Sequence, residues 1–227
     1  MDSGSESLDV AFIRARRPEQ KEQRYTAILD AARQLALRDG VGSVSLATIA
    51  ASIGMHKSAL LNYFATREEI FLRIAETEWQ SWADAVVAEL NGGSTDDAEL
   101  VTVLTRSLTD RPLFCQLLTY SALTLERNVP LDALRRSKSA AFDAAGRVAD
   151  ALHASLPTLT REACLELVTM TSVTAAGLWQ IAHPPPAVVA LHEESELRAD
   201  GGPGPIRFDD RVGRFIRIYL EGLRHSS

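Results

Sequence analysis

Residues 45–70 read SLATIAASIGMHKSALLNYFATREEI, and this stretch decides how the chain folds. Ala50 is followed four residues later by Gly54, and the apolar residues around them are Ile49, Ile53, Met55 and Leu60. Two short helices that cross steeply need a small residue at the crossing, a glycine able to take a positive φ and apolar side chains that close a small core. The stretch therefore predicts a helix-turn-helix, whose second helix runs from about His56 to Tyr63.

The charge of the chain is distributed unevenly around this motif. The 227 residues carry a formal net charge of −6. Residues 11–75 contain ten basic and six acidic residues, a net charge of +4, whereas residues 1–10 and 76–227 carry −3 and −7. A basic segment joined to a larger acidic body is typical of a polyanion-binding head on a domain with another role. Together with the helix-turn-helix pattern, this distribution predicts DNA binding.

The sequence on both sides of the motif predicts helices that would support it. Upstream, apolar residues recur with helical spacing over about 25–36, and Asp39-Gly40 is a signal for the end of a helix. Downstream, Thr66 and Glu69 form a capping-box pattern, which starts a long helix that reaches about Leu90. The first helix would pack on the motif, and the long helix would connect the motif to the rest of the chain.

The remaining chain also has helical patterns. Further helices are expected near Ala98 and Pro112 and over about 120–127, 131–156, 160–182 and 212–223. Residues 183–206 are rich in proline and glycine, so they are expected to form a loop or linker. No convincing strand pattern is found. The sequence therefore predicts an all-α protein.

Other classes of protein find little support. The first ten residues lack the apolar run of a signal peptide, and Cys115 and Cys164 stand apart as expected of reduced thiols in a cytosolic protein. Residues 167–192 lack charges, but Pro184–Pro186 leave too few residues for a membrane span. Metal-ligand spacing, a phosphate-binding loop and a G-x-S-x-G elbow are not found. We therefore expect a cytoplasmic protein with no enzymatic activity, cofactor, metal or membrane contact.

Residues 24–73 resemble the tetracycline-repressor-like (TetR) family of bacterial transcription regulators. The resemblance rests on Ser45, Ile49-Ala50, Gly54, Tyr63-Phe64 and the run Thr66-Arg67-Glu68-Glu69-Ile70. It implies an N-terminal three-helix head with a helix-turn-helix, and a C-terminal helical domain for ligand binding and dimerisation. The corresponding boundaries are a flexible arm over 1–17, a DNA-binding domain over 18–66 and an effector-binding and dimerisation domain over 67–227.

Two residues depart from the family pattern. Leu61 stands where the family usually has a tyrosine that contacts the DNA backbone, and His56 stands where serine or threonine is usual. These departures and the overall acidity leave an alternative open. In that alternative, the chain is a degenerate family member that no longer binds DNA and acts as a ligand-binding or protein-interaction adaptor.

The second short helix is expected to enter the major groove of double-stranded DNA. Lysine can donate to guanine and an amide can read adenine, so Lys57, Ser58 and Asn62 would face the base edges. The side chains of Ser45, Tyr63 and Arg67 would hold phosphates. Basic residues of the arm would reach a minor groove or nearby phosphates, or else form a solvated tail. The expected DNA-contacting residues are Ser45, His56, Lys57, Ser58, Asn62, Tyr63, Arg67 and Arg17.

The acidic body is expected to form a homodimer. The predicted helix over about 161–182 is apolar on more than one face, and the last helix, about 208–223, carries a complete apolar stripe. The pair resembles the helices from each subunit that form the four-helix dimer interface of the family, although ordinary core packing would give the same pattern. A twofold dimer would bind two half-sites of a palindromic operator.

Bulky residues on the middle helices suggest a chamber for a small molecule, apolar or aromatic in character. The expected lining residues are Trp82, Phe114, Tyr120, Phe142, Met170, Thr174 and Trp179. For each side chain taken alone, a place in the core is the favoured interpretation, and the residues suggest a chamber only as a set. If the effector binds the arrangement in which the heads are wrongly spaced, it lowers DNA affinity. The sequence thus predicts a ligand-responsive regulator, most simply a repressor that a small molecule releases from its operator.

Overall fold

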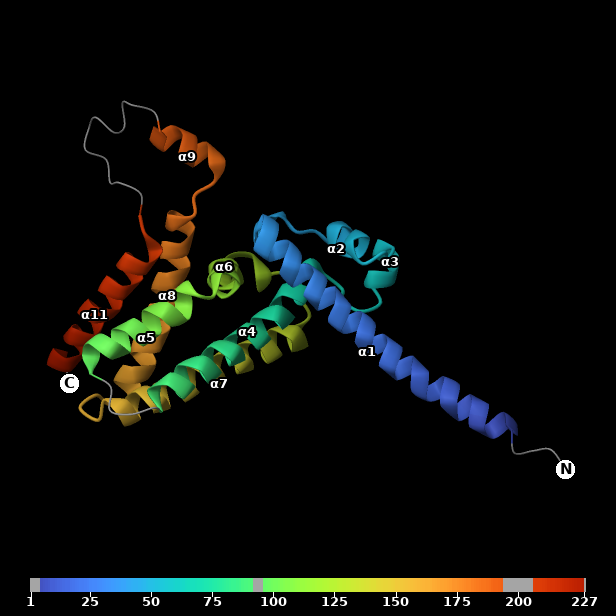
Figure 1. The fold of residues 1–227 in the computed structure, drawn as a ribbon, viewed down its shortest axis with the longest axis horizontal. Helices are drawn as coiled ribbons and strands as arrows, with labels where there is room; N and C mark the ends of the chain where they lie inside the picture. Colours follow the sequence, from blue (N-terminus) through green and yellow to red (C-terminus); the bar gives the residue numbers. More distant parts are fainter. Residues whose placement is uncertain (1–4, 92–95, 194–205, 227) are drawn as a thin grey trace.

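The computed structural model describes residues 5–91, 96–193 and 206–226, and within these ranges every regular element is a helix. Figure 1 shows a small N-terminal head beside a larger helical body. The head contains α1 (Ser5–Asp39), the 3₁₀ turn η1 (Val41–Ser43), α2 (Leu46–Ser52) and α3 (Lys57–Leu60). The body follows with α4 (Arg67–Leu90), α5 (Asp97–Thr109), α6 (Pro112–Tyr120), the π-helical turn η2 (Ser121–Leu125), α7 (Leu131–Ser155), α8 (Arg161–Ala182), α9 (Pro186–Glu193) and α11 (Phe208–Ser226). The predicted all-α fold is confirmed.

The first helix is longer than the sequence pattern predicted. It begins at Ser5, so the backbone of residues 5–17 continues α1 where an irregular arm was expected, and this end extends away from the head in Figure 1. Residues 5–24 contain no glycine and many Ala, Arg, Glu, Gln and Lys residues, which favour helix. Pro18 removes one backbone donor without ending the helix. The side chains of residues 1–18, Arg17 included, lie outside the described part of the chain.

The head has a hydrophobic core of its own. Ile28, Ala32 and Leu35 on α1 are buried against Ile49 of α2 and Leu60 of α3. Removing these side chains from water stabilises the three helices together, since α2 and α3, with seven and four residues, are too short to be stable alone. The crossing of α2 and α3 is therefore held by packing against α1.

The body is built around α4, α7 and α8. Helix α4 packs along α7, and α8 packs against α6, α7 and α11, while α5 lies against α4 and α11. In the centre, the Nε1–H of Trp82 donates to Ser107 Oγ at 3.0 Å, which joins α4 to α5. The core is closely filled by residues of all these helices.

Two helices belong to both cores. Five apolar residues at the start of α4 lie in the head core, whereas Trp82 and Val86, farther along the same helix, lie in the body core. On α6, Leu113 and Leu117 face the head core, and Phe114 faces the body core. The two parts are therefore joined by continuous packing along α4 and α6.

The predicted loop over residues 183–206 is wrong in its first half. Residues 186–193 form α9, with Pro186 at its first position, where proline is well tolerated. The proline cluster thus starts a helix at this point, and residues 194–205 lie outside the described part of the chain. Among the helices of the described residues, none has both the length and the apolar character needed to cross a bilayer.

Candidate nucleic-acid interface

The turn between α2 and α3 has the geometry that the sequence predicted. Gly54 has a φ of +65°, a conformation that other residues adopt only with strain. The backbone N–H of Met55 donates to the carbonyl oxygen of Ala50 at 2.8 Å, which closes the turn. Ser45 caps α2 through a reciprocal pair of hydrogen bonds with Thr48. The entry and the exit of α2 are therefore both fixed by local chemistry.

Four of the eight predicted DNA-contacting residues lie on α3 or directly beside it. His56, Lys57, Ser58 and Asn62 are all exposed, while Leu60 between them is fully buried. The regular helix ends at Leu60, earlier than the predicted Tyr63, because the backbone continues through tighter turns. One face of this segment is thus anchored in the head core, and the opposite face presents polar side chains to solvent.

Leu61 lies on the same exposed surface. The residue is 45% exposed. Tyr63 is half-buried two residues later, and Phe64 is buried and stacked on Tyr25 with ring centroids 4.9 Å apart. Of the two aromatic residues that directly follow Asn62, Tyr63 is therefore partly accessible to solvent and Phe64 is not.

The guanidinium of Arg67, which was predicted to contact a phosphate, has several partners within the protein. Its Nε donates to the carbonyl oxygen of Val44 at 2.5 Å, and its Nη2 donates to that of Val41. Its Nη1 pairs with Glu68 at 3.0 Å, and the guanidinium lies over the ring of Phe71, 5.1 Å from the centroid. The side chain therefore holds the segment before α2 onto the start of α4. Sequence spacing could not reveal this role, because the carbonyl acceptors lie more than 20 residues upstream.

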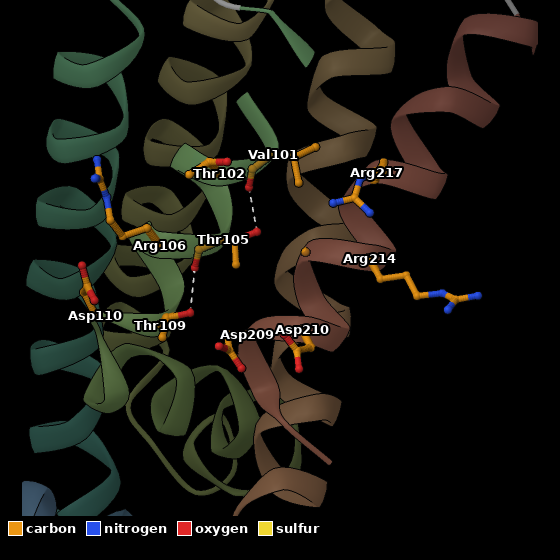
Figure 2. Close-up of a pocket in the computed structure, with 11 residues that line it drawn as sticks. Val101, Thr102, Thr105, Arg106, Thr109, Asp110, Asp209, Asp210, Arg214 and Arg217 are labelled. Atoms are coloured by element: carbon orange, nitrogen blue, oxygen red, sulfur yellow. Dashed lines mark hydrogen bonds between the residues drawn. The ribbon is translucent and has the colours of Figure 1, made fainter. Parts of the chain in front are cut away.

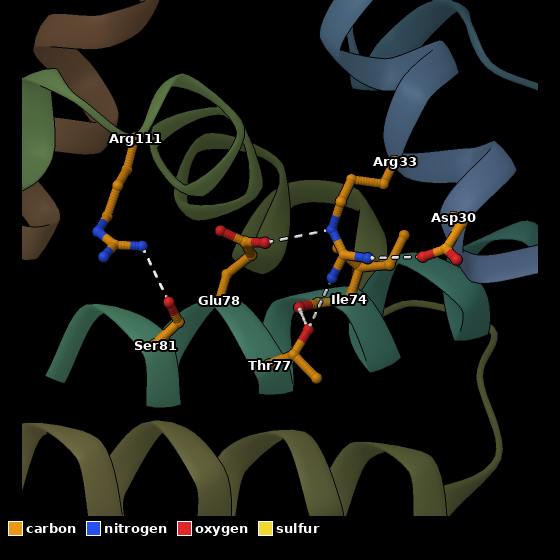
Figure 3. Close-up of polar contacts among 7 residues, drawn as sticks. All are labelled: Asp30, Arg33, Ile74, Thr77, Glu78, Ser81 and Arg111. Atoms are coloured by element: carbon orange, nitrogen blue, oxygen red, sulfur yellow. Dashed lines mark hydrogen bonds and ion pairs between the residues drawn. The ribbon is translucent and has the colours of Figure 1, made fainter. Parts of the chain in front are cut away.

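Ion pairs and hydrogen bonds hold α1 against α4 (Figure 3). Arg33 on α1 donates to Thr77 Oγ1 at 3.0 Å and pairs with Glu78 at 3.4 Å. Farther along α4, Ser81 accepts a hydrogen bond from Arg111 at 3.1 Å. The orientation of the head therefore depends on the position of α4, with Arg111 linking the same helix to the start of α6.

A second connection between head and body runs through α6. Gln116 Oε1 accepts a hydrogen bond from the backbone N–H of Val41 at 2.9 Å. A Cβ atom at Gly42 would lie 2.5 Å from the hydroxyl oxygen of Tyr120, so only glycine permits this close approach. The contact joins residues about 75 positions apart and has no local sequence signal.

The predicted effector-lining residues do not surround one chamber. Trp82 and Phe114 are fully buried and stacked, with ring centroids 5.6 Å apart, and Trp79 packs edge-on against both. Phe142 is 72% exposed on the outside of α7. The first two side chains therefore fill the core, as their bulk and apolar character favour, and the third faces solvent.

The other predicted lining residues are also dispersed. Tyr120 packs against the head at Gly42, and Trp179 stacks on His183 with centroids 3.8 Å apart. Met170 and Thr174 are half-buried on α8. Burial in this region also raises the pKa of the Cys115 thiol to about 12, as expected of a dry, closely packed interior. The expectation of one chamber lined by all seven residues is therefore corrected.

Exposed aliphatic side chains occur on the neighbouring helices α8 and α11. Val173 and Ile181 on α8 are 62% and 56% exposed, and Ile218 on α11 is 56% exposed. The hydroxyl of Tyr219 donates to Glu166 at 2.5 Å and holds the two helices together. Aliphatic residues this exposed on two adjacent helices mark a candidate surface for association.

The sequence and the fold were compared with known proteins. Residues 28–74 match the family described as bacterial regulatory proteins, tetR family, and residues 76–227 match the tetracyclin repressor-like, C-terminal domain. No curated protein matches the chain.

Solved structures of similar fold extend over nearly the whole chain. A protein described as a TetR-family transcriptional regulator from Mesorhizobium loti has a TM-score of 0.54 at 13% identity, covering 91% of this chain and 97% of its own. The fatty acid degradation regulator FadR from Bacillus halodurans has a TM-score of 0.51 at 14% identity, covering 85% and 94%. At such identities the likeness supports the fold alone. The match of the C-terminal family over two thirds of the sequence, with the N-terminal match directly before it, shows that this chain belongs to the TetR family of transcriptional regulators.

Proposed function

We propose that the chain is a cytoplasmic, homodimeric repressor that binds a palindromic operator through α3 and is released by a small molecule. The observation that carries this proposal is the polar surface of α3, whose buried side is fixed in the head core. A rigid helix with exposed donors is what major-groove recognition requires, because the base contacts depend on a defined register.

The proposed DNA contacts follow from what each exposed group can donate or accept. Lys57 and Asn62 would read base edges, with Ser58 between them. His56 and Ser45 lie at the starts of α3 and α2, where backbone N–H groups and side chains together favour phosphates. The side chain of Leu61 cannot donate to a phosphate, so Tyr63 is proposed to make the backbone contact on this side.

Residues of α1 would add to the contact with DNA. The helix carries Arg14, Arg16 and Arg17 in the part that extends beyond the head. A basic helix end near the duplex would bind phosphates without reading sequence. In this proposal Arg67 contributes indirectly, by holding the segment before α2 in place.

Dimerisation is proposed to occur through α8 and α11. A second copy would cover Val173, Ile181 and Ile218, which are too exposed for aliphatic residues that face only water. The isologous pairing of two helices from each chain would form a four-helix interface. Two heads held at a fixed spacing would then bind two half-sites together, which raises the affinity far above that of one head.

Release by an effector is proposed to act through α4 and α6. Both helices pack on the head core and on the body core, so a shift of either would move the head. The bond from Val41 to Gln116 and the contact of Arg33 with Glu78 would carry that shift. An effector that favours one arrangement lowers operator affinity by the same coupling free energy, commonly about 1–3 kcal/mol.

One observation favours the adaptor alternative, namely the exposed Leu61 on the proposed DNA-facing surface. The two functions are separated by selecting bound duplexes from a random pool with the full-length protein. A repressor of the proposed kind enriches a palindrome, whereas an adaptor enriches no sequence.

The proposal is tested by measuring operator affinity of two lysine variants by fluorescence anisotropy at matched salt. Lys57→Ala is expected to weaken binding by at least about tenfold, because it removes a charge-assisted contact with a base. Lys138→Ala removes the same charge from α7 of the body and should change the affinity less than about twofold. Sedimentation should find both variants dimeric. Equal affinities of the two variants would contradict the assignment of α3.

A further inference from the structure

A groove of about 510 Å³ lies between α5 and α11, on the outside of the body (Figure 2). None of the residues expected to line an effector chamber is among those that line it. Its volume falls within the range of about 300–1,000 Å³ that is usual for small-molecule sites. The groove is therefore large enough for a compact organic ligand, and it is separate from the filled core described above.

The wall on α5 is formed by threonines. Thr102, Thr105 and Thr109 line the groove, and their hydroxyls donate to backbone carbonyls one turn earlier on the same helix. Because the hydroxyl hydrogens are used within the helix, the wall offers methyl groups and oxygen lone pairs to a ligand. Val101 adds an apolar side chain to the same wall. This surface suits a mostly apolar ligand body.

The wall on α11 approaches α5 closely at Gly213. A Cβ atom at this position would lie 3.0 Å from Thr105 Oγ1, so even an alanine would require the Thr105 side chain to shift. The absence of a side chain leaves the backbone of α11 as the floor of the groove. The depth of the site therefore depends on this glycine.

The charged groups at the groove differ in whether they are already paired. Asp209 and Asp210 both pair with Arg207, which also lowers the pKa of Asp209. Arg106 pairs with Glu89 and points toward α4. The acidic groups at the start of α11 are thus partly neutralised, and Arg106 already has a partner.

Arg217 is the cation that faces the open groove. In Figure 2 its side chain extends toward α5, whereas the side chain of Arg214 extends away from the groove. Over the described residues, no ion pair or hydrogen bond is formed by the Arg217 guanidinium. A guanidinium without a partner beside an apolar wall is well suited to bind a carboxylate through two parallel hydrogen bonds.

We propose that this groove binds a small organic monocarboxylate, with Arg217 holding the carboxylate and the threonine wall packing against the apolar body of the ligand. The site goes beyond the proposed function, because binding there requires neither DNA nor the effector that would release the repressor. It would also stay open in the proposed dimer. Gly213 and Arg217 face α5, whereas Tyr219 faces α8 on the other side of α11.

The test uses calorimetric titration of the full-length protein with hexanoate and with benzoate. Hexanamide and benzamide, which keep the apolar body and lose the charge, are expected to bind at least about tenfold more weakly. Inorganic phosphate, which has charge and no apolar body, should also bind at least about tenfold more weakly than the better carboxylate. This comparison separates a carboxylate site from a site for any anion.

Two variants of the same helix provide the matched comparison. Arg217→Gln should weaken carboxylate binding by at least about tenfold, while Arg211→Gln, which removes the same charge from an exposed position of α11 outside the groove lining, should change it less than about threefold. Both positions are exposed, so thermal unfolding should be unchanged and serves as the folding control. The inference is overturned if neither carboxylate binds, if the two variants bind equally, or if phosphate binds as well as the carboxylates. Operator binding is not part of this readout, so its failure would leave the repressor proposal standing.

Discussion

The head and the body of this protein differ in how exposed and buried residues relate to function. In the head, the candidate DNA-contacting residues lie at fixed offsets from Gly54, and their exposure follows from the burial of Ile49 and Leu60. In the body, bulky residues selected as ligand contacts turned out to be core residues such as Trp82 or surface residues such as Phe142. The comparison teaches that a short motif determines which side of a helix faces outward, whereas bulk and hydrophobicity alone do not identify a cavity.

The largest expected effect tests the assignment of Trp82 to the core. Trp82→Ala should lower the free energy of unfolding by about 3–5 kcal/mol, because it leaves a cavity among Trp79 and Phe114 and removes the bond to Ser107. Phe142→Ala serves as the matched control and should change it by less than about 0.5 kcal/mol, since its side chain is mostly exposed. Urea unfolding at a fixed protein concentration measures both. A Trp82→Ala protein of unchanged stability would mean that this residue lines a hollow after all.

A smaller effect distinguishes a structural role of Arg67 from a phosphate contact. Arg67→Ala should destabilise the protein by about 2 kcal/mol, because it removes charge-assisted bonds to the carbonyls of Val41 and Val44. Arg67→Lys should recover only part of this loss, since an ammonium group cannot reproduce the planar geometry.

The dependence of operator affinity on salt provides the second readout for Arg67. Loss of a phosphate contact reduces the slope of log affinity against log salt by about 1. The structural role predicts an unchanged slope for Arg67→Ala under conditions where the variant is fully folded. A reduced slope would restore Arg67 to the set of DNA contacts and would remove this difference between prediction and structure.

The smallest expected effect concerns the junction between the two regions. Gln116→Leu leaves the Val41 N–H without its acceptor and should destabilise the protein by about 1 kcal/mol. Gln116→Glu keeps a side-chain oxygen at the same reach and should retain most of the stability. Hydrogen exchange of the Val41 amide, followed by NMR, should be faster in the leucine variant than in the glutamate variant. Equal exchange in both would show that this bond does not connect head and body in solution.

Much of the fold was predictable because it rests on local rules. The helix-turn-helix and the starts of α4 and α8 follow from capping residues, glycine and apolar spacing within short windows. The start of α1 was mispredicted because the apolar spacing begins only near Tyr25, and α9 was missed because a stretch rich in proline and glycine was interpreted as a loop. Pro186 lies where its missing N–H costs little, and Pro18 is tolerated within a long helix.

The candidate sites were predictable to different degrees. The exposed face of α3 is opposite its buried face, so the exposure of Lys57, Ser58 and Asn62 could be predicted from the sequence. The groove between α5 and α11 was not, since it depends on two helices more than 100 residues apart along the chain. The contacts of Gln116 with Val41 and of Arg33 with α4 were missed for the same reason.

The amino-acid sequence by itself determined the helical class, the head with its turn at Gly54 and the outward-facing residues of α3, because these depend on φ preferences and on periodicity within a few turns. Only the tertiary structure decided which aromatic residues of the body are packed, where a groove remains open and which charged groups are already paired. Those properties depend on distances between segments that are remote in sequence. A free guanidinium such as that of Arg217 differs from a paired one such as that of Arg67 only in its neighbours, and the fold determines which residues these are.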